Sequence, residues 1–98
     1  MTVEYIRYEI PLTERTAFVA AYAEAKVPSM ASPYATSFDI CQCDEDPGHF
    51  ILRIEWTSAE DHMQKFRGSA AFRTFFDHIK PYVGNITEMR HYTRIDQG

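Results

Sequence analysis

The amino-acid sequence predicts an α+β domain in which one antiparallel β-sheet carries helices on a single face. Three observations predict it. Four segments are rich in β-branched and aromatic residues, two others carry apolar residues at helical spacing, and a short acidic turn joins the second and third strand-like segments. Because the chain has only 98 residues, a second domain would lack a core of its own. We therefore expect a single domain over residues 1–98.

The first strand and the first helix are expected near the start of the chain. Val3 to Ile10 reads VEYIRYEI and stops at Pro11, which is typical of a strand. Thr13 is a candidate N-cap for a helix from Glu14 to Lys26. The prolines between Val27 and Tyr34 predict a loop after that helix. The helix has one apolar stripe, made by Ala17, Phe18, Ala21, Tyr22 and Ala25.

A β-hairpin is expected in the middle of the chain. Ala35 to Cys43 and His49 to Thr57 are strand-like, and the residues between them, DEDPG, form the strongest turn signal in the sequence. Two strands joined by so short a turn pair antiparallel. The third strand alternates two sets of side chains, Phe50, Leu52, Ile54 and Trp56 against Ile51, Arg53 and Glu55.

The second helix is expected to be broken. Ser58 is its candidate N-cap, and the Gly68–Ser69 pair interrupts it. Ser69 can cap a further helical segment from Ala70 to Ile79, and Ile86 to Ile95 is the closing strand. The element order is therefore β-α-β-β-α-β, the ferredoxin-like order, with a four-stranded antiparallel sheet whose first and third strands are central.

One face of this sheet has no helix to cover it. There the first and third strands mix aliphatic, aromatic and oppositely charged side chains. A second copy of the chain would cover such a surface, so we expect a homodimer. The alternative is a solvated face held by cross-strand ion pairs.

Composition excludes several classes of protein. The net charge is −4 and no two basic residues are adjacent, so we expect no nucleic-acid partner. No apolar stretch approaches the roughly 18–20 residues of a membrane span, and the N-terminus does not have the pattern of a signal peptide, so a cytoplasmic location is expected. Cys41 and Cys43 would lie about 7 Å apart on one strand face, too far to form a disulfide. We expect them to be free thiols without a metal.

Two blocks of sequence identify a family resemblance. Phe50 to His62, FILRIEWTSAEDH, resembles the third strand and helix entry of antibiotic biosynthesis monooxygenase domains. Phe66 to Phe72, FRGSAAF, is similar to the small-residue break and following aromatic of that family. The resemblance covers nearly the whole chain. It implies a homodimer whose two sheets form a joint α+β barrel. In some members it implies oxidation of phenolic, quinol or anthrone substrates by dioxygen without metal or flavin, and in others degradation of haem.

The resemblance also marks departures from the family pattern. Trp56 matches the aromatic at the end of the third strand and would form a pocket wall. The strand Asn and the helix His of some oxygenase members are Leu52 and Phe66 here. The haem-ligating His of the haem-degrading branch would be Phe76. We therefore expect no haem, metal or flavin cofactor.

Histidine and aromatic residues remain as candidates for chemistry. His62 in the second helix and His91 in the last strand are the candidate catalytic bases, and each has a purely structural role as its alternative. Arg67 or Arg73 is a candidate for holding an anionic group. The candidate substrate-binding residues, which would equally suit a plain hydrophobic core, are Trp56, Phe66, Phe72, Phe76 and Tyr92.

The predicted function is a cofactor-independent monooxygenase that oxidises a small aromatic or quinol-type substrate in a pocket between sheet and helices. The alternative is a non-catalytic dimeric module that binds a small hydrophobic ligand or a protein partner. The sequence does not specify the substrate.

Overall fold

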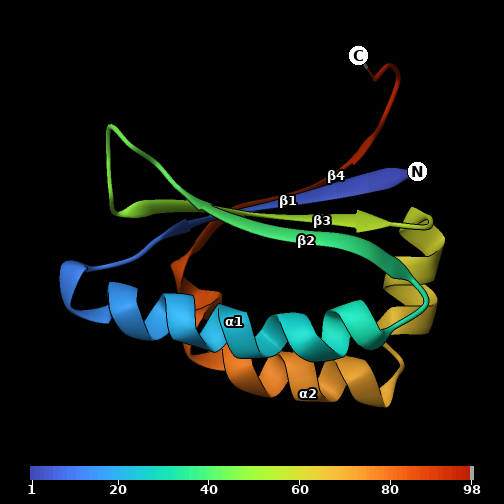
Figure 1. Ribbon diagram of the computed structural model, residues 1–98, viewed down its shortest axis with the longest axis horizontal. Helices are drawn as coiled ribbons and strands as arrows, with labels where there is room; N and C mark the ends of the chain where they lie inside the picture. The colour runs from blue at the N-terminus through green and yellow to red at the C-terminus, as the bar shows by residue number, and fades with distance from the viewer. Residues whose placement is uncertain (98) are drawn as a thin grey trace.

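The computed structural model describes residues 1–97 and places both main helices on one face of a four-stranded sheet (Figure 1). The strands are β1 (Thr2–Glu9), β2 (Ala35–Gln42), β3 (His49–Trp56) and β4 (Ile86–Thr93). All pairs are antiparallel, and the strand order is β2-β3-β1-β4. The predicted fold class and the central positions of the first and third strands are confirmed.

The first helix differs from the prediction at both ends. A 3₁₀ turn, η1 (Leu12–Glu14), contains the predicted cap Thr13, and α1 (Arg15–Ala31) follows without a side-chain cap. The helix continues through Pro28, where a loop was predicted. Ala25 and Ser29 are fully buried, and the Ser29 hydroxyl donates to the Ala25 carbonyl over 3.2 Å. Burial of this face outweighs the one backbone hydrogen bond that proline removes.

The second helical region is divided as the sequence indicates. The Ser58 hydroxyl accepts a hydrogen bond from the Asp61 backbone N–H over 2.9 Å, which confirms the predicted cap. A π-helical segment, η2 (Asp61–Phe66), ends before Gly68, and Ser69 caps α2 (Ala70–Ile79) by accepting from the Phe72 N–H. The short η3 (Lys80–Asn85) then leads into β4.

The core fills the space between the sheet and the helices. Phe50, Leu52, Ile54 and Trp56 of β3 all point to the helices and are at most 2% exposed. The neighbouring Ile51, Arg53 and Glu55 lie on the other face and are half-buried, as the predicted alternation requires. From α1, the rings of Phe18 and Tyr22 pack against this layer. Among residues 1–97, no helix is both long and apolar enough to cross a membrane.

Candidate active site

Three titratable side chains meet on the helix side of the sheet. Glu4 of β1 lies directly opposite His91 of β4 in the strand register, and His62 reaches them from η2. His62 Nδ1 and His91 Nε2 are 2.6 Å apart and share a hydrogen bond. The Glu4 carboxylate lies 3.7 Å from His62 Nε2 and 3.8 Å from His91 Nε2. We call these three residues the Glu4–His62–His91 cluster.

Trp56 at the end of β3 fixes two members of the cluster. Its indole N–H donates to Glu4 Oε1 over 3.1 Å. Its ring also stacks on the His62 imidazole, with 4.2 Å between centroids and 10° between planes. One aromatic side chain therefore orients both the carboxylate and the imidazole. The predicted role of Trp56 as a pocket wall agrees with this position.

Burial sets the protonation of the cluster. Glu4 is 2% exposed, and desolvation raises its pKa from 4.5 to about 7, against the opposing effects of the Trp56 hydrogen bond and the Arg67 charge. Desolvation lowers the pKa of His62 to about 3, assisted by Arg67 and His91. Desolvation also lowers the pKa of His91, and the Arg67 charge assists it. Near neutral pH the two imidazoles are therefore neutral, and Glu4 lies close to its midpoint.

A cavity of about 170 Å³ adjoins the cluster. Glu4, His62 and Arg67 line it at the polar end. Tyr8 contributes at the far end of β1, where its hydroxyl bonds to that of Tyr22. The rest of the wall is apolar and comes from β1, β3, η2, α2, η3 and β4, with Ile6, Ile54, Trp56, Phe66, Phe72, Phe75, Phe76, Ile79, Val83, Ile86 and Met89.

The structure brings most of the predicted site residues together. Trp56, Phe66, Phe72 and Phe76 line the cavity beside His62, and His91 bonds to His62 from the same side. Tyr92, predicted to contact substrate, lies instead on the opposite face of the sheet. It is 46% exposed and packs edge-on against Tyr5. Successive strand residues point to opposite faces, so Tyr92 cannot reach the cavity when His91 points to the helix side of the sheet.

Glu4 is not among the site residues predicted from the sequence. The signal for it was present, because Glu4 shares a strand face with the apolar residues Ile6, Tyr8 and Ile10. A carboxylate on a core face must have partners. The pairing of Glu4 with His91 across the strands depends on the β1–β4 register, which the sequence does not give.

The cluster has the donor atoms of a possible metal site. Glu4, His62 and His91 each offer one donor atom, and these atoms lie within 4.8 Å of one another. Two imidazoles and a carboxylate are a donor set that divalent transition metals accept. The Arg67 guanidinium on the same cavity opposes a cation, since a divalent ion would bring the charge of this buried region to +2 with Glu4 ionised. We therefore interpret the cluster as an acid–base group.

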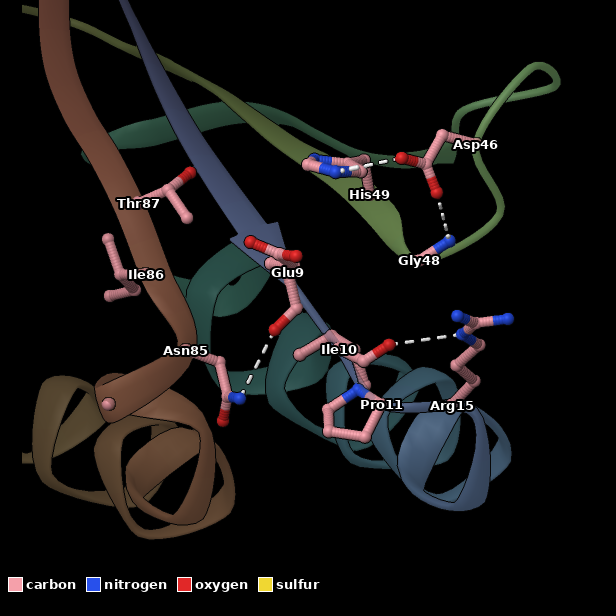
Figure 2. Close-up of a pocket in the computed structure, with 11 residues that line it drawn as sticks. Glu9, Ile10, Pro11, Arg15, Asp46, Gly48, His49, Asn85, Ile86 and Thr87 are labelled. Atoms are coloured by element: carbon pink, nitrogen blue, oxygen red, sulfur yellow. Dashed lines mark hydrogen bonds and ion pairs between the residues drawn. The ribbon is translucent and has the colours of Figure 1, made fainter.

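A second hollow is larger but has a different character (Figure 2). It measures about 420 Å³ and lies at the other end of β1. Its polar groups bond to one another: His49 pairs with Asp46 at 3.0 Å, Arg15 Nε donates to the Ile10 carbonyl, and Asn85 donates to the Glu9 carbonyl. These contacts join the β2–β3 turn to the start of β3, and join α1 and η3 to the end of β1, so we assign the hollow a structural role.

The chain is therefore a ferredoxin-like domain with a cavity between sheet and helices. The family model described as antibiotic biosynthesis monooxygenase matches residues 1–78, so the chain belongs to this family. The resemblance seen in the sequence is thereby confirmed.

Solved structures of low sequence identity share this fold. A candidate antibiotic biosynthesis monooxygenase from Bordetella bronchiseptica is 20% identical, with 96% of each chain covered and a TM-score of 0.79. One from Nitrosomonas europaea is 21% identical, covering 98% of this chain and 100% of its own, with a TM-score of 0.76. One from Chloroflexus aurantiacus is 15% identical, with 99% and 95% coverage and a TM-score of 0.76. These similarities concern the fold alone. No curated protein matches the sequence.

Proposed function

We propose that the protein is a cofactor-independent oxygenase that uses dioxygen to oxidise a small hydroxyaromatic or quinol-type substrate. The observation that carries the proposal is the Glu4–His62–His91 cluster, of which Glu4 and His62 line a mostly apolar cavity. Membership in the monooxygenase family supports the same reaction class.

Glu4 is the proposed proton acceptor. A general base works best when its pKa lies near the working pH, and the Glu4 pKa of about 7 meets that condition. His62 has a pKa of about 3, so it stays neutral. Its hydrogen bond with His91 fixes both rings beside the carboxylate. The proposal therefore keeps the two predicted histidines in the site and gives them the role of positioning the base.

The substrate supplies all the electrons in this reaction. Glu4 takes the hydroxyl proton, and the resulting anion transfers electrons to dioxygen. One oxygen atom forms a new bond to a ring carbon that loses its hydrogen, and the other oxygen leaves as water. A phenol and dioxygen thus give a quinone and water, with no outside reductant. The apolar cavity wall excludes bulk water, which strengthens the interaction between the base and the hydroxyl proton.

The proposed assembly is a homodimer. The sheet face opposite the helices carries Tyr5, Arg53, Glu55 and Tyr92, and Arg53 bonds to Glu55 there at 2.6 Å. Tyr92 is 46% exposed, and a second copy laid across this face would bury it. Sedimentation equilibrium tests this part: a species of twice the 11.4 kDa chain mass is expected, and a monomer at all concentrations would contradict it.

Oxygen consumption by chelator-treated protein tests the proposed reaction. The substrates are one-ring and two-ring phenols and quinols, and the variants are Glu4→Gln, His62→Asn and His91→Asn. His49→Asn is the matched control, because His49 lies at the turn beside the other hollow. Turnover above the uncatalysed rate, lost in Glu4→Gln and kept in the control, is the expected result. If some of these compounds bind and none is oxidised, the oxygenase is rejected and a binding module is favoured.

A further inference from the structure

Arg67 carries a buried polar atom that has no bonding partner. Among residues 1–97, its Nε is the single buried side-chain nitrogen or oxygen atom without a hydrogen bond. Arg67 lines the cavity beside Glu4 and His62, and it forms no ion pair within 4.0 Å in the described part of the chain. A buried donor without an acceptor costs roughly 1–3 kcal/mol, so this atom requires an explanation.

The π-helical turn explains why Arg67 faces the cavity. The Arg67 backbone N–H donates to the His62 carbonyl over 3.2 Å, which closes a turn over five residues. In an α-helix, residues four apart share a face. The wider turn places His62, Phe66 and Arg67 on one side, and all three line the cavity. Single π-helical turns occur frequently at functional sites.

The charged side chains of the cavity wall can balance the charge of a bound anion. Glu4 is the one acidic residue among the lining side chains, and Arg67 is the one permanent cation. When Glu4 accepts a proton, the guanidinium no longer has a carboxylate in the cavity. A ligand with an anionic oxygen would then restore the balance of charge and accept a hydrogen bond from the guanidinium.

The cavity volume limits the size of that ligand. It is about 170 Å³, close to the roughly 150 Å³ of an engineered apolar cavity that binds benzene. Phe66, Phe72 and Phe76 provide aromatic surface for a ring. A single aromatic ring with small substituents therefore matches the space.

From these observations we infer that Arg67 is the anion-binding residue of the cavity and that its ligand is a one-ring aromatic bearing a carboxylate or an ionised hydroxyl. This inference names the substrate class for the proposed oxygenase and rests on that proposal only for the reaction, not for binding. The ring packs against the phenylalanines, and the anionic oxygen accepts from the Arg67 guanidinium.

Equilibrium binding of three one-ring probes tests the inference. The probes are 4-nitrobenzoate, 4-nitrophenolate and the neutral 4-nitrobenzyl alcohol, bound to wild type, Arg67→Met, Arg67→Lys and Arg73→Met. Arg73 is the control, since it is exposed on α2 and does not line the cavity. Arg67→Met should weaken anion binding roughly 10- to 100-fold and change binding of the neutral probe less than about threefold. Arg67→Lys should recover part of the loss.

The comparison with the neutral probe separates loss of the anion site from loss of the fold. Preference for either anion, abolished by Arg67→Met and kept by Arg73→Met, supports the inference. The preferred anion then shows whether the charge belongs to a carboxylate or to the hydroxyl. Wild type that binds the neutral probe as well as both anions, or an Arg67→Met variant that keeps the preference, overturns it. An anion preference without oxygen consumption would reject the oxygenase alone.

Discussion

Removing the charge of Glu4 should stabilise the protein above neutral pH. In the folded chain the pKa of Glu4 is about 7, against an ordinary value of 4.5, because the carboxylate is buried. The folded state therefore binds more protons than the unfolded chain between these two values. The stability associated with Glu4 is complete below pH 4.5 and is lost as the pH rises through 7. At about 1.4 kcal/mol per pH unit, the loss is about 3 kcal/mol.

Glu4→Gln keeps the hydrogen bond from Trp56 and cannot ionise. The groups facing Glu4 are His62 from η2, His91 from β4 and Arg67 after η2, and all three remain in the variant. Compared with wild type, Glu4→Gln should be more stable by about 3 kcal/mol at pH 8 and nearly equal at pH 4.5.

Urea unfolding at fixed protein concentration across this pH range measures the difference in unfolding free energy. Glu9→Gln is the control, because Glu9 lies on the same strand and is exposed. A Glu4→Gln variant whose stability follows the wild-type pH dependence would refute the interpretation that burial raises the pKa of Glu4. A loss of stability at pH 8 would also refute it.

The contacts of Trp56 and Ser69, and the response of the protein to metal ions, give three further predictions. Trp56→Phe removes the N–H that Glu4 accepts and should cost about 1–3 kcal/mol in urea unfolding; no cost would show that the bond is unimportant. Ser69→Ala removes the cap of α2 and should cost about 1 kcal/mol, whereas an unchanged midpoint would argue against the cap. Oxygen consumption should survive chelation and stay unchanged with added Zn²⁺, because the Arg67 guanidinium beside the cluster opposes a divalent cation; activity that requires added metal would contradict a cofactor-free reaction.

Much of the fold could be predicted because local signals agree with it. The alternation in β3, the DEDPG turn and the caps at Ser58 and Ser69 all occur where the sequence indicates. The end of α1 was missed because Pro28 is a strong local signal for a helix end. The structure shows that burial of Ala25 and Ser29 overrides it, and a single sequence does not show which helix face the sheet will cover.

The candidate site was only partly predictable because it depends on non-local geometry. His62 and Trp56 follow from the strand and helix patterns. The pairing of Glu4 with His91 depends on the strand register. Arg67 reaches the cavity through a five-residue turn, where a regular helix would point it elsewhere. For Tyr92 the sequence did contain the answer, since the strand period excludes it once His91 is placed inside.

The absorption spectrum of bound 4-nitrophenol shows whether the cavity removes a proton from a hydroxyaromatic and holds the anion. At a pH below the pKa of the free probe, binding to wild type should produce the phenolate band, and Arg67→Met should bind the probe without it. Binding of the neutral phenol by wild type, with no phenolate band at any pH below that pKa, would contradict the account.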